Sequence, residues 1–255
     1  KYEYERLEMK ITIVLPCYNS KEYLHQSVES ALAQDYHNYE VHAYDNGSTD
    51  GSLEYLREVE QNNSLFVVHE VPNIYKNSYR EASDHAFQNL DTDYITFLCA
   101  DDYLDSKYLS NCMKIISHDP EKIRCIQSPI LGVPDNIEHS HLYNSLKEFK
   151  ELCMIRSPVI TPTMVYNKNL YPLMNWAPHG GPAHRASNLQ EAGVGDYDTF
   201  CNFADNGIFI YPVPKFLGYY YRWHEKQCTW SVISEKKETN YDKIIQEYWK
   251  KKWTL

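Results

Sequence analysis

YITFLCADDYL, residues 94–104, is the stretch that says most about the architecture of this chain. Its first five residues are apolar, β-branched or aromatic, a composition typical of a buried strand. The run then ends in two adjacent carboxylates, Asp101 and Asp102. In open α/β sheets ligands bind beyond the carboxyl ends of the strands. A divalent cation that also holds phosphate oxygens would neutralise two acids at such a point. A solvated loop, or the N-cap of a following helix, is the alternative interpretation.

Strand-like and helix-like segments alternate from residue 10 to about residue 119. Short apolar runs predict strands at 10–16, 39–44, 65–69 and 94–98. Apolar residues at helical spacing predict helices at 21–34, from the polar turn at 45–51 to about residue 59, at 79–90 and at 105–117. This alternation is typical of an α/β fold with a mostly parallel central sheet, right-handed connections and helices on both faces.

The second half of the chain is less regular. We expect strands at 125–130, 159–166, 208–213 and 216–223, and helices at 147–153 and 196–203. Residues 177–186 hold Pro, Gly and His and predict a loop. Residues 236–252 predict a terminal helix whose buried stripe is Tyr241, Ile245, Tyr248 and Trp249. There is no internal repeat and no low-complexity linker, so we expect one compact domain.

Composition narrows the classes of function. The chain has 255 residues, 43% of them hydrophobic, which is enough to build a core. A formal net charge of −10 argues against general nucleic-acid binding, although a local basic pocket for phosphates stays open. The 23 tyrosines suit carbohydrate or nucleobase faces, and equally the edges and interfaces of a protein.

Cysteine usage and hydropathy bear on the cellular compartment. The seven cysteines are odd in number and none has CxxC spacing, which favours reduced thiols in a cytosolic protein. No apolar run has transmembrane length and no signal peptide precedes the first strand. The chain starts at Lys1 without Met. We therefore expect a cytoplasmic protein without an integral membrane segment, either peripheral to a membrane or a domain of a larger protein. The histidines at 139–141 and 179–184 are expected in exposed loops rather than at a metal.

Three predicted strands end in polar or turn-like residues, at 16–19 (PCYN), 45–48 (DNGS) and 101–102 (DD). In a parallel sheet these ends share one edge. An aromatic at the first could stack on a base, a carboxylate at the second could accept from a base N–H or a ribose hydroxyl, and the acids at the third could hold a cation. Ordinary turn chemistry explains each end alone. The common dinucleotide and nucleoside-triphosphate motifs, GxGxxG and GxxxxGK[ST], are absent from the sequence.

Residues 14–52 (VLPCYNSKEYLHQSVESALAQDYHNYEVHAYDNGSTDGS) resemble the amino-terminal half of the family 2 glycosyltransferases of GT-A fold. The usual pattern of that family is a strand, P-x-Y-N, a helix ending near Q, a strand, and D-x-[GS]-S-x-D-G-[ST]. The resemblance covers residues 10–117 well and the rest only through spaced markers. It implies a GT-A-type single domain over residues 1–255, with a nucleotide-sugar-binding half at 10–119, an acceptor-binding half at 120–235 and a C-terminal helix at 236–255.

The resemblance also implies a reaction. Family 2 enzymes carry out an inverting transfer of a sugar, usually from a UDP-sugar, with Mn²⁺ or Mg²⁺. The acceptor would be a hydroxyl of a glycan or of another molecule. The sugar, the acceptor and the oligomeric state do not follow from the sequence.

Matching positions imply the site residues. The implied donor-binding residues are Pro16, Tyr18, Asn19, Asp45, Arg80, Cys99, Ala100 and Asp102. Within this set, Pro16, Tyr18 and Asp45 would line the base and ribose site, and Asp102 would lie near the metal or the donor sugar. Asp101 occupies the position of the family's metal-binding acid. Arg80 is either a residue that approaches the donor or a solvated residue on a helix.

Two markers lie in the second half. Residues 193–198 (GVGDYD) resemble the family's E-D segment, which implies that Asp196 is the catalytic base, although Gly195 replaces the preceding acid. Asp196 could instead be only a helix N-cap. Residues 221–224 (YRWH) resemble a late Y-R-x-H segment, which implies that His224 ligates the metal or touches the diphosphate. A lone histidine is otherwise more often structural.

Cys99 departs from the family pattern, because it replaces the first Asp of a D-x-D-D form. A thiol is a weak hydrogen-bonding group and a soft metal ligand, so the substitution bears on donor affinity and on activity. Two alternatives to a working glycosyltransferase remain. One is a catalytically impaired module that binds a nucleotide-sugar or a partner. The other is a nucleotidyltransferase, which would normally carry a Gly-rich, basic loop after the first strand.

Overall fold

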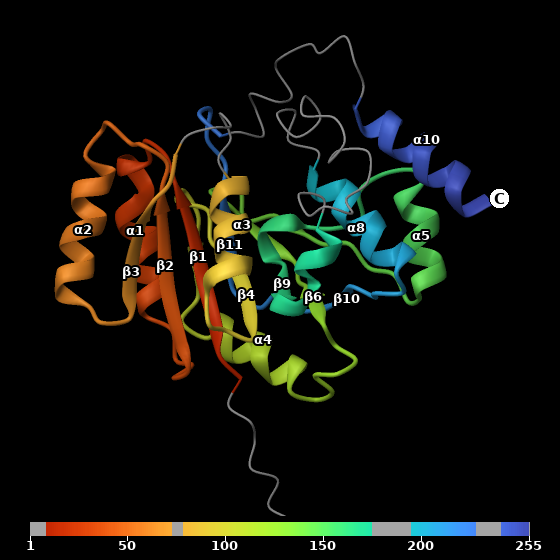
Figure 1. The fold of residues 1–255 in the computed structure, drawn as a ribbon, viewed down its shortest axis with the longest axis horizontal. Coiled ribbons are helices and arrows are strands. Elements are labelled where there is room, and N and C mark those ends of the chain that lie inside the picture. The colour runs from red at the N-terminus through yellow and green to blue at the C-terminus, as the bar shows by residue number, and fades with distance from the viewer. Residues whose placement is uncertain (1–8, 73–78, 175–194, 228–240, 255) are drawn as a thin grey trace, which may run out of the picture.

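A computed structural model describes residues 9–72, 79–174, 195–227 and 241–254. The main sheet has seven strands in the order β10-β6-β9-β4-β1-β2-β3 (Figure 1). At its centre β1 (Ile11–Cys17) runs parallel to β2 (Tyr39–Asp45) and to β4 (Tyr94–Phe97), and β2 runs parallel to β3 (Phe66–Glu70). All four strands lie where the apolar runs predict them, which confirms a mostly parallel α/β sheet.

Helices cover both faces of this sheet, as predicted. Alternate side chains of β1 point to opposite faces, so Ile13 and Leu15 belong to one apolar cluster and Val14 to the other. The first cluster packs against α1 (Lys21–Leu32), α2 (Ser52–Asn62) and α4 (Tyr108–Ile116). The second packs against α3 (Tyr79–Asn89), α5 (Leu146–Cys153), α8 (Gly195–Asp205) and α10 (Tyr241–Thr254).

The expected strand at 125–130 is two separate strands. β6 (Cys125–Gln127) joins the main sheet, and β7 (Ile130–Val133) joins a second one. The break falls at Ser128 and Pro129, because proline has no N–H to continue a ladder and the Ser128 N–H donates to Thr163 Oγ1 instead, at 3.0 Å. The expected strand at 159–166 is also shorter. Only β9 (Val165–Asn167) pairs, antiparallel to β4 and β6, after the 3₁₀ turn η1 (Thr161–Thr163).

A second sheet of four strands, in the order β5-β11-β7-β8, was not predicted. β5 (Tyr103–Leu104) follows Asp102 directly and pairs antiparallel with β11 (Tyr219–Arg222), while β8 (Glu138–His139) pairs with β7. β11 is the paired part of the expected strand at 216–223. Gly218 precedes it with φ +120°, and a Cβ there would lie 2.6 Å from Asp105 Cβ, so only glycine fits this approach. This sheet carries the end of β11 to the acids that follow β4.

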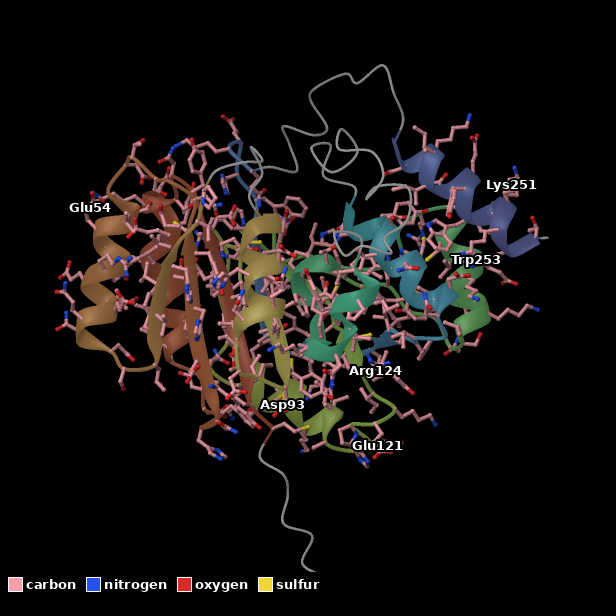
Figure 2. All side chains as sticks on the ribbon, in the orientation of Figure 1. Glu54, Asp93, Glu121, Arg124, Lys251 and Trp253 are labelled. Carbon is pink, nitrogen blue, oxygen red and sulfur yellow. The ribbon has the colours of Figure 1, made fainter. Side chains whose placement is uncertain are left out.

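Two short elements complete the second half, the 3₁₀ helix η2 (Lys168–Leu173) and the strand β10 (Tyr211–Pro212) at the edge of the main sheet. The C-terminal helix α10 packs on α8, with Ile245 and Trp249 almost fully buried, as its apolar stripe predicts. Figure 2 shows Lys251 on the outer side of α10, whereas Trp253 Nε1 donates to Asp205 Oδ1 of α8 at 3.0 Å. The expected loop at 177–186 and residues 236–240 of the expected helix lie outside the described residues. Among the described helices, none combines the length and the apolarity needed to cross a bilayer.

Candidate active site

The ends of β1 and β2 lie side by side, with Cys17 paired to Asp45 in the register of the sheet. The turns that follow are joined by hydrogen bonds. Asn19 adopts a left-handed conformation, φ 49°, which asparagine tolerates. Its N–H donates to Ser48 Oγ at 3.0 Å, and its Oδ1 accepts from the Thr49 N–H at 2.8 Å. The first two predicted strand ends therefore form one connected surface, and Asn19 lies within it.

Asp45 is 1% exposed and uses only one of its carboxylate oxygens. Oδ2 accepts from the N–H groups of Gly47 and Ser48 at 2.8 and 2.9 Å. Oδ1 is buried and has no hydrogen-bond partner among the described residues, and the same holds for both polar atoms of the neighbouring Asn46 side chain. Unpaired buried polar atoms are costly, so a polar partner at this position would be stabilising. This fits the predicted base and ribose site.

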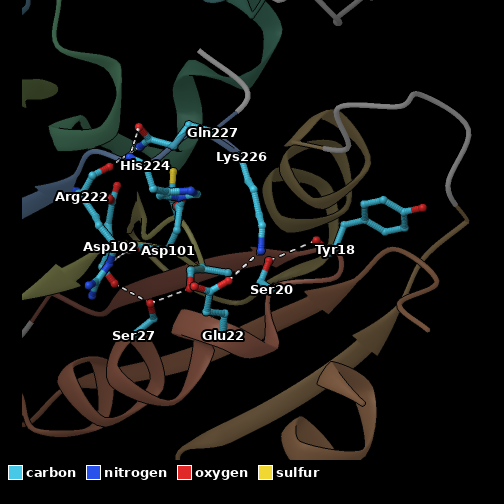
Figure 3. A network of polar contacts seen from close by, with 12 residues as sticks. Tyr18, Ser20, Glu22, Ser27, Asp101, Asp102, Arg222, His224, Lys226 and Gln227 are labelled. Atoms are coloured by element: carbon cyan, nitrogen blue, oxygen red, sulfur yellow. Dashed lines mark hydrogen bonds and ion pairs between the residues drawn. The ribbon is translucent and has the colours of Figure 1, made fainter. Parts of the chain in front are cut away.

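Tyr18 and Pro16 flank this position. Tyr18 is 45% exposed, and Figure 3 shows its ring pointing away from the polar network at the third strand end. Pro16 is half-buried at the end of β1. Contact of either residue with a base stays a prediction. Arg80 lies in the first turn of α3, and its side chain is outside the described part of the chain.

The third strand end is a tight turn held by α1. Ser27 Oγ donates to the carbonyl oxygens of Ala100, at 2.8 Å, and of Asp102. Cys99 Sγ and carboxylate oxygens of Asp101 and Asp102 all lie within 4.8 Å of one another, close enough for one metal ion. The turn thus brings a thiol and two carboxyl groups together. Ala100 helps to hold the turn through its backbone carbonyl, which accepts from Ser27.

β11 brings His224 to the same turn. His224 Nε2 lies 2.9 Å from Asp101 Oδ2, and the Arg222 Nε–H donates to the Asp101 carbonyl at 2.8 Å (Figure 3). The His224 ring packs against Tyr23 of α1, with ring centroids 4.6 Å apart. His224 and Asp101, predicted from separate motifs 123 residues apart in sequence, are therefore direct neighbours.

Asp102 is fully buried, and both of its oxygens bind β11. Tyr219 Oη donates to Oδ2 at 3.0 Å and the Arg222 N–H donates to Oδ1 at 2.8 Å. Burial, and then the adjacent charge of Asp101, raise the pKa of the Asp102 carboxyl well above its usual range. The sequence pattern predicts contact with the metal or the donor sugar, whereas the structure shows a carboxyl that ties two elements together. Direct contact with a donor stays a prediction.

The last residue of β11 and the segment that follows it contact α1. The Arg222 guanidinium lies over the Tyr23 ring, 4.7 Å from its centroid, and donates to Gln26 Oε1 at 2.5 Å. Lys226 forms an ion pair with Glu22 at 2.8 Å. Sequence reasoning missed Ser27, Gln26 and Tyr219, because each acts through a contact with a segment more than 70 residues away. No local pattern marks such residues.

Asp196 lies in the first turn of α8. Its Oδ2 accepts from Thr161 Oγ1 of η1 and its Oδ1 from the Tyr197 N–H at 2.7 Å. Burial raises the pKa of the Asp196 carboxyl. Asp198, one of the next residues of α8, is fully buried and accepts from Trp249 Nε1 at 2.8 Å, so it anchors α10. The structure therefore gives the two acids different surroundings.

The model of the family described as Glycosyl transferase family 2 matches residues 12–171, more than half of the chain. The chain belongs to glycosyl transferase family 2. Among curated relatives, glycosyltransferase GlyA of Streptococcus pneumoniae is 30% identical over 42% of this chain and 15% of GlyA. Chondroitin synthase of Pasteurella multocida is 27% identical over 78% of this chain and 19% of that enzyme. The chain thus spans less than a fifth of these two relatives.

Solved structures share the fold of this family 2 chain. A fragment of S. aureus TarS in complex with UDP-GlcNAc superposes with a TM-score of 0.66, at 18% identity, over 90% of this chain and 62% of the fragment. The mannosyltransferase PcManGT from Pyrobaculum calidifontis, in complex with GDP-Man and Mn²⁺, gives a TM-score of 0.61 at 15% identity, over 94% of this chain and 68% of that enzyme. At these identities the likeness shows the fold, and it agrees with the GT-A-type architecture that the sequence predicts.

Proposed function

We propose that this chain is an inverting, divalent-metal-dependent glycosyltransferase that moves a sugar from a UDP-sugar to a hydroxyl of a glycan or another acceptor. The observation that carries the proposal is the meeting of Asp101 and His224, 2.9 Å apart, at the edge of the sheet where β1, β2 and β4 end. The first two of these strand ends carry the turns joined through Asn19 and the buried, unpaired oxygen of Asp45. These groups suit a cation and a nucleotide at one edge.

The residues present fit a divalent cation. Carboxylate oxygens suit Mn²⁺ and Mg²⁺, and an imidazole nitrogen is a good ligand for transition metals. Asp101 and His224 would hold the ion, with Cys99 and Asp102 close by. Once bound, it would supply positive charge that offsets the charge developing on the departing diphosphate. The presence of Mn²⁺ in the PcManGT complex supports this choice.

The nucleotide would bind along the turns after β1 and β2. Asp45 Oδ1 and the Asn46 side chain can pair with polar edges of a base or ribose, and Tyr18 offers an exposed ring beside them. The UDP-GlcNAc and UDP bound to TarS support a uridine donor, while the GDP-Man bound to PcManGT shows that the fold accepts another base. We propose UDP because residues 14–52 match the family pattern that usually goes with it.

Asp196 would act as the general base. An inverting displacement needs a carboxylate on the acceptor side to take the hydroxyl proton as the new bond forms. The hydrogen bond from Thr161 orients Asp196, and its raised pKa brings its basicity closer to that needed near neutral pH. On this proposal residues 10–119 bind the donor and residues 120–235 bind the acceptor.

A turnover assay with a panel of UDP-sugars and glycan acceptors, in Mn²⁺ and in EDTA, tests the function. We expect transfer from at least one UDP-sugar, lost in EDTA. Cys99 in place of the family's first Asp favours a second candidate, a nucleotide-sugar-binding module without catalysis. Binding of a UDP-sugar without any transfer would support that candidate. The family assignment favours sugar transfer over nucleotidyl transfer.

A cytoplasmic setting is part of the proposal. Cys17, Cys112, Cys125, Cys153 and Cys201 are buried as free thiols in the described part of the chain. Buried reduced thiols suit a reducing compartment. A labelling experiment on the native protein from its own cells, with and without reductant, would check that these thiols are reduced.

A further inference from the structure

We propose that Tyr219 is a positioning residue, and that its hydrogen bond with Asp102 sets the distance between Asp101 and His224. This inference rests on the proposed function, because it assigns a role in forming the metal site. It also gives Asp102 a different role from that of a metal ligand. Tyr219 belongs to β11, and Asp102 ends the turn that carries Asp101.

The Tyr219 hydroxyl binds the turn on both sides of Asp101. It accepts from the Cys99 N–H at 3.3 Å and donates to Asp102 Oδ2 at 3.0 Å. The second Asp102 oxygen accepts from the Arg222 N–H at 2.8 Å, which lies two residues before His224. A closed set of contacts therefore runs from the turn to the strand that delivers His224.

These contacts lie in the interior. Tyr219 and Asp102 are both 0% exposed. A buried hydroxyl and a buried carboxyl are costly unless paired, and apolar groups of similar volume often stabilise a core equally well. What the polar pair adds is direction, because two hydrogen bonds fix the carboxyl relative to the backbone at Cys99 and Arg222. Phenylalanine in place of Tyr219 would fill the same space, remove the Tyr219 donor to the buried Asp102 carboxyl and remove the Tyr219 acceptor of the Cys99 N–H.

Two other side chains also support the turn. Arg222, from β11 itself, donates its Nε–H to the Asp101 carbonyl at 2.8 Å, which holds the backbone and not the Asp102 carboxyl. Ser27 of α1 binds the carbonyl oxygens of Ala100 and Asp102, so it fixes the turn to the helix. Among the hydrogen bonds of the described residues, Ser27 makes none with β11. The pairing of Tyr219 with Leu104 and of Tyr220 with Tyr103 sets the register of β11 on β5, after the turn. The hydrogen bond between Tyr219 and Asp102 therefore holds the turn that carries Asp101 to the paired strand β11.

Calorimetry of UDP binding, in Mn²⁺ and in EDTA, tests the inference with Tyr219→Phe. Loss of a residue that orients metal ligands typically costs about 10–100-fold in metal affinity. We expect the Mn²⁺-dependent part of the UDP affinity to fall by about tenfold, at the low end of that range, with UDP binding in EDTA unchanged.

Tyr143→Phe is the matched control. Tyr143 is also buried, and its hydroxyl likewise donates once, to the Ile210 carbonyl at 2.7 Å, and accepts once, from Gln127 Nε2 at 2.8 Å. The two variants should lose similar thermal stability, and only Tyr219→Phe should lose Mn²⁺-dependent affinity. Equal metal dependence in Tyr219→Phe and wild type would overturn the inference and leave the proposed function standing. A wild-type protein without any metal dependence would overturn both.

Asp102→Asn is a second variant that tests the same inference if Tyr219→Phe folds poorly. An amide can accept from the Arg222 N–H and donate to the Tyr219 hydroxyl, so the shape of the contact is kept. A positioning role predicts that Asp102→Asn retains most Mn²⁺-dependent UDP affinity, in contrast to Asp101→Asn. A loss as large as that of Asp101→Asn would show that Asp102 is a metal ligand and would overturn the inference.

Discussion

At Cys99 this chain departs from the D-x-D-D form that its family usually has. The thiol is partly exposed, beside Asp101 and Asp102, where the family usually has an acid. Its N–H is bound by Tyr219, so the backbone at this position is held independently of the side chain. The backbone hydrogen bond at this turn therefore does not depend on the Cys99 thiol.

Cys99→Asp tests how that position works. Because it is partly exposed, a carboxylate there avoids the full cost of a buried charge. A hard oxygen ligand suits Mn²⁺ better than a thiol does. We expect the UDP affinity in Mn²⁺, measured by calorimetry, to rise or stay level. Should the site have been rebuilt around the thiol, the variant would instead lose thermal stability. Normal stability with weaker UDP binding would contradict both accounts of Cys99.

Asp196 and Asp198 form an internal pair of variant and control. We predict that Asp196→Asn folds and binds UDP with Mn²⁺ normally but loses about 10²–10⁴-fold in transfer, the usual contribution of a general base. Asp198→Asn keeps an oxygen that can accept from Trp249, so it should keep most of the activity.

The proposed base, Asp196, must be ionised to act, and burial raises the pKa of its carboxyl. Wild-type kcat/KM should therefore fall on the acid side at a higher pH than for an ordinary aspartate. Near-wild-type turnover of Asp196→Asn would leave the base unidentified.

At the scale of elements, local sequence patterns predicted two kinds of element. These are the strands that consist of one buried apolar run, and the helices that bury one apolar stripe. β1, β2, β3 and β4 and the four helices between and after them follow that rule. The second sheet does not, because β5 has two residues and pairs with a strand more than 100 residues away. The 3₁₀ turn at 161–163 likewise depends on tertiary contacts of Thr163 with Ser128. The candidate site shows the same division, since motifs identified Asp101 and His224 while Tyr219 and Ser27 act only through distant pairing.

A histidine cluster joins β2, β3 and α3. His42 Nδ1 lies 2.8 Å from His69 Nε2, and the His69 and His85 rings are 4.9 Å apart. Burial, then the neighbouring His42 and His85, lower the pKa of His69 to about 4, against a weaker opposing effect of Glu60. Burial also lowers the pKa of His42, which contacts Glu40.

This cluster predicts how stability depends on pH. Between pH 6.5 and about 4 the unfolded chain binds protons at His69 that the folded chain does not. The free energy of unfolding should therefore fall as the pH drops through this window, and level off below it for this residue. In His69→Gln, urea titrations at pH 7 and pH 5 should show a smaller loss. His118→Gln, at an exposed position, should behave like wild type. An unchanged pH dependence in His69→Gln would contradict this account.

At the scale of the whole molecule, the candidate site draws on both halves of the chain. Asp45 and Asp101 come from the β–α units of the first half. Tyr219 comes from the second sheet, and His224 follows the end of its strand β11 by two residues. The family match ends at residue 171, before β11 and before His224, which follows that strand. Asp101 therefore lies inside the part of the chain that the family model matches, and His224 lies outside it. The proposed metal site depends on the contact between these two residues.

Calorimetric titration of UDP into the chain, in Mn²⁺ and in EDTA, tests that metal site most directly. Diphosphate and Asp101 repel each other unless a cation lies between them. We predict that UDP binds at least about tenfold more tightly in Mn²⁺ than in EDTA, and that Asp101→Ala removes this difference. Equal affinity in Mn²⁺ and EDTA for the wild-type chain would contradict the account.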